Sequence, residues 1–401
     1  MIEKLEALLD DFDKSVRKNA LLELIELKKI GKVKWEEEKE ISNMHCHSFF
    51  SFNGYGYSPI KIAWLCKKNG IKLCQIVDFD VLDGVEELFY AADLLNLKAS
   101  VGIETRVFIP ELKDTETNSP GEPGVSYLLG MGFTKLPLPG TSAYRILKDM
   151  FHRAHARTRK MVDTLNEYLD AIRVEYDTEV ISLTPNGNVT ERHILKAFYN
   201  KSKDVFKTPA SFIRYWALKL LVQEEDINNG LDNPNILCEI IRSKLMKNGG
   251  IAYIKPNSKT FPEIQTANKM ITELGAIPCA GWLDGTSPGE KKLEELLDLL
   301  VSKGISMMNI IPDRNYNIKD REEKRIKIKN LYKAVEIAKK LSLPIVAGTE
   351  MNKFGQKLVD DFNSKELSPI RKSFMDGAYF LHDHTLRQKI KDKGKRRNEK
   401  R

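Results

Sequence analysis

Short apolar segments recur between about residue 41 and residue 350, and segments with helical periodicity lie between them. Several apolar segments are continuous rather than alternating, as in the runs 277–282 and 343–348. Continuous runs are typical of strands buried on both faces, which is the environment of a parallel sheet. Strands that alternate with helices indicate an α/β architecture, either a barrel or a doubly wound sheet. We predict strands at 41–48, 73–79, 99–108, 125–133, 179–183, 251–254, 276–282, 305–312 and 343–350.

Two regions depart from this alternation. Residues 1–30 carry leucines at helical spacing, which predicts one or two amphipathic helices. Helical patterns also dominate between the turn-rich segments at 118–124 and 248–250. We therefore expect a helical leader at 1–40, the first part of a sheet domain at 41–140, a mostly helical insertion at 141–250, the second part of the sheet domain at 251–385 and a basic tail at 386–401.

The net charge of +8 is concentrated at one end of the chain. Residues 386–401 hold nine basic and two acidic side chains, a net +7, so the rest of the chain carries +1. A nearly neutral body argues against a protein whose whole surface binds nucleic acid, which leaves the tail as the segment for any contact with a polyanion. We expect the tail to be a solvated, irregular terminus.

The composition is that of a globular protein, with 42% hydrophobic and 30% charged residues. No apolar run reaches the roughly 18–20 residues of a membrane span, so we expect no membrane partner. The N-terminus shows no secretory pattern, and the five cysteines include no Cys-x-x-Cys pair. These features predict a cytoplasmic protein without disulfides.

The sharpest chemical feature is His45-Cys46-His47 at the end of a predicted strand. Residues i and i+2 of a strand point the same way, so the two imidazoles would face one side and could share a metal ion. The alternative is a pair of ordinary histidines at a turn.

Acidic residues stand at the ends of other predicted strands. Asp78 and Asp80 close the second strand, Glu104 lies in the third and Glu350 closes the last. Each alone could be a helix cap. Because barrel enzymes build their sites at the C-terminal ends of strands, the four acids together with the two histidines indicate a metal site.

The order of these motifs resembles the PHP (polymerase and histidinol phosphatase) superfamily of metal-dependent phosphoesterases. His45-Cys46-His47-Ser48 is similar to the family's His-x-His-Ser, and Gly102-Ile103-Glu104 to its Gly-Ile-Glu. Looser matches follow in chain order at 77–84, 127–130, 153–169, 190–194 and 347–352. The resemblance covers about residues 41 to 355. It implies a distorted, TIM-like (β/α)7 barrel, here with a mostly helical insertion and an N-terminal helical leader.

The sequence departs from the family pattern where four ligand histidines would stand. Those positions fall at Phe79, at Tyr127 or Leu128, within 280–282, and at Asn352. The donors that remain are His45, His47, Glu104, Glu350 and Asp78 or Asp80. They suffice for one divalent ion (Mn, Fe or Zn) and leave a bridged pair open.

If the resemblance extends to activity, the protein hydrolyses a small phosphorylated metabolite or nucleotide. It implies that cations of the insertion hold the phosphate, either Arg192 and His193 or else Arg106 and Arg145. Asn53 and Asn352 are further polar candidates on the substrate side.

One alternative is a degenerate barrel without a full metal site that acts as a binding or scaffold protein. Another is an amidohydrolase-like enzyme. The sequence argues against it, because no later lysine or histidine stands at a strand end to complete such a site. The oligomeric state stays open.

Overall fold

The computed structural model describes residues 1–231 and 233–398. The chain divides into two compact units, one formed by residues 1–148 together with 262 onward, the other by Asp149–Phe261. The sequence suggested 141–250 for the insertion. The first boundary falls inside helix α5 (Ser142–Tyr168), where no turn marks it.

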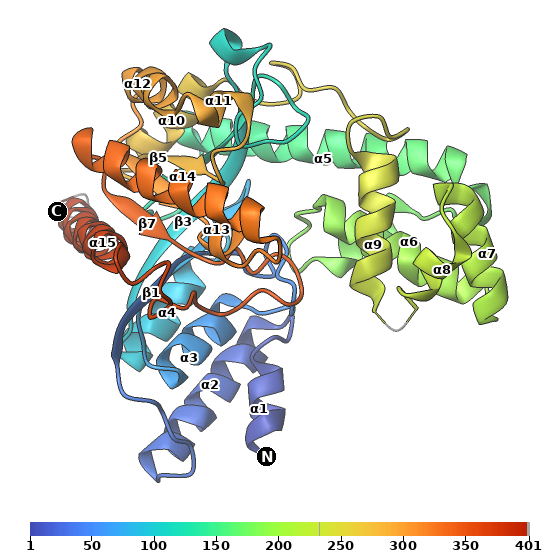
Figure 1. Ribbon diagram of the computed structural model, residues 1–401. Helices are drawn as coiled ribbons and strands as arrows, with labels where there is room; N and C mark the ends of the chain where they lie inside the picture. Colours follow the sequence, from blue (N-terminus) through green and yellow to red (C-terminus); the bar gives the residue numbers. More distant parts are fainter. Residues whose placement is uncertain (232, 399–401) are drawn as a thin grey trace. The chain divides into compact units, whose positions relative to one another are not determined.

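Unit 1 contains a seven-stranded sheet whose spatial order follows the chain order, β1 to β7. Figure 1 labels four of these strands, β1, β3, β5 and β7. A parallel bridge between Cys46 and Glu350 nearly closes the sheet into a barrel. The fold is therefore the α/β barrel with N-terminal helices and a helical insertion that the sequence predicted. The strands are β1 (Lys39–Cys46), β2 (Ile71–Phe79), β3 (Lys98–Phe108), β4 (Val125–Met131), β5 (Ile277–Trp282), β6 (Met307–Ile310) and β7 (Ile345–Ala347).

The continuous apolar runs are buried as expected. Every residue of β6 and β7 is buried, and β1 is buried over its second half, where it approaches the site. One strand breaks the parallel pattern, because β4 is antiparallel to both β3 and β5. The segment between β3 and β4 contains no crossover helix, only the short 3-10 turn Pro110–Leu112, so the chain returns in the opposite direction.

Two predicted strands are wrong. Residues 179–183 lie in the helical turns Tyr176–Val180 and Ile181–Leu183, and 251–254 form no strand. In the first case Tyr176 and Val180 are buried in the helical core of unit 2. In the second, Ile251 is 53% exposed directly after two glycines, so it has no sheet to join.

Unit 2 is helical, as the sequence predicted for the insertion. Its helices pack around one apolar core that includes Phe198, Phe212 and Trp216. Besides most of α5, they are α6 (Glu191–Val205), α7 (Pro209–Leu220), α8 (Glu224–Asn228) and α9 (Pro234–Ile241), followed by the single turn Arg242–Met246.

The helices of unit 1 connect and cover the strands. The leader forms α1 (Ile2–Leu8) and α2 (Lys14–Lys29), and Glu6 on α1 accepts a hydrogen bond from Trp64 Nε1 on α3 at 2.8 Å. The leader thus packs on the barrel's own helices. The others are α3 (Pro59–Lys68), α4 (Val85–Leu95), α10 (Ile264–Glu273), α11 (Pro288–Lys291), α12 (Leu293–Ser302), α13 (Asp313–Tyr316), α14 (Arg321–Lys340) and α15 (Arg371–Asn398).

The basic tail is helical rather than irregular over its described part, because α15 continues to Asn398. Asp392 accepts a hydrogen bond from Thr134 Oγ1 at 2.6 Å and pairs with Lys135. The Lys389 ammonium lies 3.5 Å from the ring centroid of Phe89. These contacts attach the helix to unit 1, and residues 399–401 lie outside the described chain.

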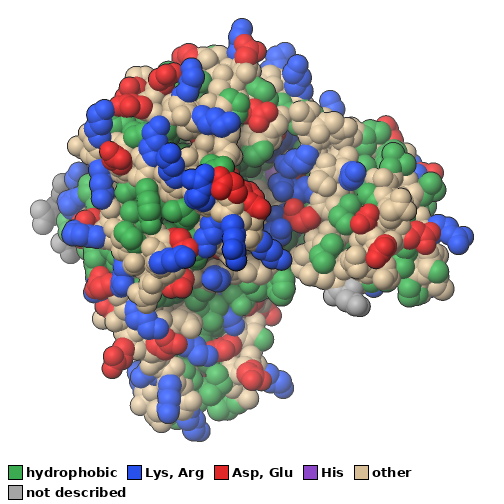
Figure 2. Space-filling view, in the orientation of Figure 1, with side chains coloured by type: hydrophobic (Ala, Val, Ile, Leu, Met, Phe, Trp, Pro, Cys, Tyr) green, Lys and Arg blue, Asp and Glu red, His purple; other side chains and the backbone are tan. Residues whose placement is uncertain are grey.

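Surface charge on the described chain is mixed. On the face in Figure 2, Lys and Arg side chains are interspersed with Asp and Glu side chains. None of the described helices combines the length and apolar content that crossing a membrane requires.

Candidate metal centre

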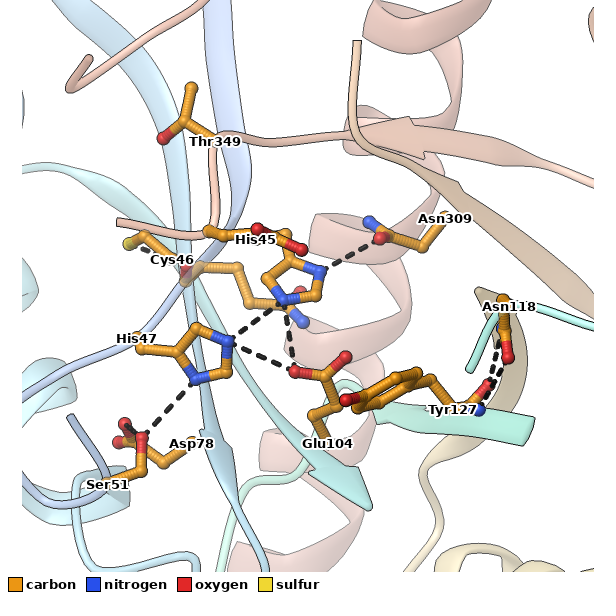
Figure 3. Close-up of polar contacts among 12 residues, drawn as sticks. His45, Cys46, His47, Ser51, Asp78, Glu104, Asn118, Tyr127, Asn309 and Thr349 are labelled. Atoms are coloured by element: carbon orange, nitrogen blue, oxygen red, sulfur yellow. Dashed lines mark hydrogen bonds and ion pairs between the residues drawn. The ribbon is translucent and has the colours of Figure 1, made fainter. Parts of the chain in front are cut away.

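The two motif histidines lie at the end of β1 and face the same side, as the strand period requires. Both are buried, and their Nε2 atoms are 3.4 Å apart (Figure 3). Cys46, between them, points away and donates its thiol hydrogen to the Gln75 carbonyl at 3.2 Å. The local strand geometry alone therefore brings two ring nitrogens together.

Glu104 on β3 brings a carboxylate to the same point. Its Oε2 lies 3.5 Å from His45 Nε2 and 3.1 Å from His47 Nε2. His45, His47 and Glu104 form a buried group whose ligand atoms are close enough to share one ion. Donors held at about 2.0–2.2 Å from an ion would be about 2.8–3.6 Å from one another at octahedral to tetrahedral angles. The observed separations fit that range.

Hydrogen bonds fix which nitrogen of each imidazole carries the proton. His45 Nδ1 is 2.8 Å from Asn309 Oδ1, which can only accept, so Nδ1 carries a proton, and in the neutral ring Nε2 has the lone pair. His47 Nδ1 is 3.3 Å from Ser51 Oγ, whose own proton goes to Asp78 at 2.7 Å. His47 therefore also donates from Nδ1. The two Nε2 atoms and the Glu104 oxygen therefore face one another, so either protons on Nε2 or a metal ion can join them, and neutral imidazoles in this tautomer are suited to bind a cation.

The charges of the group reinforce one another. Burial by itself would raise the pKa of Glu104, but the neighbouring charge and hydrogen bonds of His45 and His47 lower it to about 2. Burial likewise would lower the pKa of His45, but the Glu104 carboxylate raises it above its ordinary value. Glu104 is thus ionised at neutral pH.

Two of the other predicted ligands have hydrogen-bonding partners outside this group. Asp78 accepts hydrogen bonds from the backbone N–H and hydroxyl of Ser48, both at 2.7 Å, as well as from Ser51. Asp80 has a left-handed backbone, with φ 57°, and accepts from Thr105 Oγ1 at 2.6 Å. Asp78 therefore orients His47 through Ser51, while a ligand role for either acid stays a prediction.

Glu350 is held against the group by the bridge that closes the barrel. Its N–H donates to the His45 carbonyl at 2.8 Å, and its own carbonyl accepts from the His47 N–H at 2.7 Å. Its carboxylate receives Arg314 Nη2 at 3.0 and 3.1 Å. Burial would raise the pKa of Glu350, but the charge of Arg314 lowers it below the ordinary value.

The predicted substrate residues divide between the units. Asn53 organises its own loop, since its Nδ2 donates to the His47 carbonyl at 2.8 Å and its Oδ1 accepts from two backbone N–H groups. Asn352 is half-buried in the loop after Glu350. In unit 2, Arg192 pairs with Glu239, and His193 caps the start of α6 through Thr190. Substrate contact by these four residues stays a prediction.

The sequence reasoning missed Asn309 and Arg314. Asn309 is a buried amide in the otherwise apolar strand Met307–Ile310, and that isolated polar residue was a readable signal. Arg314 lies just after the same strand, and nothing in the sequence indicates its partner. Phe79, at a family histidine position, stacks on His47 with ring centroids 4.2 Å apart, so an apolar wall stands where another ligand would be.

Replacing Asn309 by alanine should lower the affinity for a divalent ion by about 10- to 100-fold, because His45 loses the acceptor that fixes its proton and its ring orientation. Titration calorimetry with Zn²⁺ measures this. Asn268→Ala is the control, since it also removes a buried amide of unit 1. Asn268 donates to the Lys303 carbonyl after α12 and contacts none of the three candidate ligands through that bond. Equal affinities in both variants would contradict the assignment.

Comparison with known proteins supports the fold. No protein-family model matches the sequence, and no curated protein matches it. An amidohydrolase from Chromobacterium violaceum with bound sulfate and no metal matches with a TM-score of 0.53 and 15% identity, over 82% of this chain and 96% of that one. A candidate metal-dependent phosphoesterase from Bifidobacterium adolescentis matches with a TM-score of 0.52 and 15% identity, over 84% and 98%.

These similarities establish the fold class. The chain shares the fold of these two structures, a nearly closed α/β barrel of seven strands, and within that barrel it has a buried group that could hold one metal ion.

Proposed function

We propose that this protein is a metal-dependent hydrolase of phosphate esters, with its centre at His45, His47 and Glu104. The observation that carries the proposal is the convergence of two Nε2 lone pairs and one ionised carboxylate oxygen within 3.5 Å of one another. In their neutral form the two imidazoles direct Nε2 lone pairs at the same point as the carboxylate oxygen, and one divalent ion would join all three donors.

A divalent ion bound there would lower the pKa of a bound water and neutralise charge on the phosphate oxygens. The chain's own residues prepare the site. His45, His47 and Glu104 would hold the ion, while the contacts of Asn309 and Ser51 with the Nδ1 atoms orient both imidazoles for it. The stacked ring of Phe79 shields one side of His47 from water.

A phosphate ester is the substrate class that the similar structures favour. One is described as a metal-dependent phosphoesterase, and the other, described as an amidohydrolase, carries sulfate, an oxyanion of phosphate-like shape. We propose a small phosphorylated metabolite or a nucleotide, hydrolysed with Mn, Fe or Zn as the cofactor.

The proposal is tested by assaying the purified chain against a panel of phosphorylated metabolites and nucleotides, with added Mn²⁺, Fe²⁺ or Zn²⁺ and with chelator. We expect phosphate release that depends on metal and is lost in Glu104→Gln. Phosphate release that persists in chelator and in that variant would contradict the proposal.

The missing family histidines, with Phe79 packed on His47, favour one second candidate, a barrel that binds phosphorylated compounds without hydrolysing them. Binding of an intact phosphate ester with no turnover under any metal would support that candidate instead.

A further inference from the structure

Arg314 presents unused donors beside the candidate metal centre. It lies on the short helix α13, just after β6, and its side chain is 45% exposed. Its Nη2 contacts both oxygens of Glu350, whereas its Nε and Nη1 make no hydrogen bond with any residue of the described chain. A guanidinium has five N–H donors in a planar fork, so most of its capacity remains for another acceptor.

The position of Arg314 is set by the barrel itself. Glu350, its partner, is tied to the end of β1 by backbone bonds to the His45 carbonyl and from the His47 N–H, one on each side of Cys46, and its carboxylate accepts from Gln356 Nε2 at 3.2 Å. The carboxylates of Glu350 and, more weakly, Glu104 stabilise the charged form of the guanidinium. Arg314 is therefore a fixed cation at the edge of the three-ligand group.

The charges of the site leave room for one metal ion and an anion. A divalent ion bound by two neutral imidazoles and the Glu104 carboxylate would give the group a net charge of +1. The Glu350 charge is already balanced by Arg314, so a second ion would have to displace the guanidinium. Arginine matches the oxygens of a phosphate geometrically and is a standard partner for them.

We propose that the centre takes a single divalent ion and that Arg314 supplies the second positive charge, binding a phosphate oxyanion through its free Nε and Nη1. The single-ion part rests on the proposed function, while the anion-binding part stands on the guanidinium itself. Arg314 is thus a substrate-binding residue that neither the sequence nor the comparisons assign.

The test measures two quantities on the full chain: bound metal, by elemental analysis after dialysis against Mn²⁺, and the affinity for inorganic phosphate, by calorimetry. The variants are Arg314→Met, Arg314→Lys and Glu350→Gln. The control is Arg325→Met, which removes an exposed arginine of α14 that pairs with Glu322. Thermal unfolding of each variant confirms that it is folded.

We expect about one equivalent of metal in all of these chains, since the three donors of the group are untouched. The phosphate affinity should fall by about 10- to 100-fold in Arg314→Met, because that is the loss expected when charge-assisted hydrogen bonds are removed. It should fall less in Arg314→Lys, which keeps the positive charge. It should be unchanged in Arg325→Met.

Two equivalents of metal in the wild type, one of them lost in Glu350→Gln, would overturn the single-ion proposal. Phosphate affinity in Arg314→Met equal to that of the control would overturn the anion-binding proposal while leaving the hydrolase intact. Conversely, a chain that binds phosphate through Arg314 but binds no metal would refute the hydrolase and support the role of Arg314.

Discussion

Replacing His45 or His47 by alanine, or Glu104 by glutamine, is expected to lower the affinity for a divalent ion by more than about 100-fold. Mutating a residue that only hydrogen-bonds to a metal ligand already lowers metal affinity by about 10- to 100-fold, and these changes remove a ligand itself. Each change removes one of three donors that converge within 3.5 Å. Calorimetric titration of the metal-free chain with Zn²⁺ measures the loss.

His384→Ala is the matched control for these variants. His384 is also in unit 1, but it lies on α15, where its ring contacts the Gly275 carbonyl at 2.8 Å. We expect this variant to bind metal like the wild type. If all three ligand variants kept wild-type affinity, the ion would bind elsewhere, and the site assignment would be wrong.

The second large effect concerns stability. Arg17 on α2 and Glu87 on α4 form a salt bridge in which both side chains are almost fully buried, and Arg17 Nε donates to Glu87 Oε1 at 2.9 Å. Arg17→Met should lower the free energy of unfolding by about 3–5 kcal/mol, because it leaves the Glu87 carboxylate buried without its partner. Urea denaturation followed by circular dichroism measures the change.

An exposed pair between the same two helices serves as the comparison. Lys14 and Glu86 lie 3.3 Å apart at the surface, and Lys14→Met should cost no more than about 1 kcal/mol. A double variant that replaces both Arg17 and Glu87 by apolar residues should recover much of the loss, since no unpaired charge remains. Equal costs for Arg17→Met and Lys14→Met would contradict the view that the leader is part of the barrel's stable fold.

The fold could be predicted where a strand is buried on both faces. The runs at 277–282 and 343–350 contain β5 and β7, because continuous apolar sequence needs cover on both sides. The direction of β4 could not be predicted, since it depends on the absence of a crossover helix after β3. The segment 179–183 was wrongly predicted as a strand. Its buried Val180 packs into the helical core of unit 2, whose other residues lie elsewhere in the chain, so the segment's own sequence could not indicate a helical turn.

The site was predictable where its geometry is local. His45 and His47 share a face because they are two residues apart in a strand. The roles of Asp78 and Arg314 depend on partners that lie 27 residues away at Ser51 and 36 residues away at Glu350, and no spacing rule connects them. Glu104 was predicted as an acid within the third strand and again by the family resemblance, and the register that pairs it with Phe79 explains its position.

The central claim is that one ion lies between His45, His47 and Glu104. The most direct measurement is diffraction from crystals grown with Zn²⁺, recorded at the zinc absorption edge. We predict an anomalous peak about 2.0–2.2 Å from both Nε2 atoms and from a carboxylate oxygen of Glu104. Strong zinc peaks elsewhere, with none between these three side chains, would contradict the account.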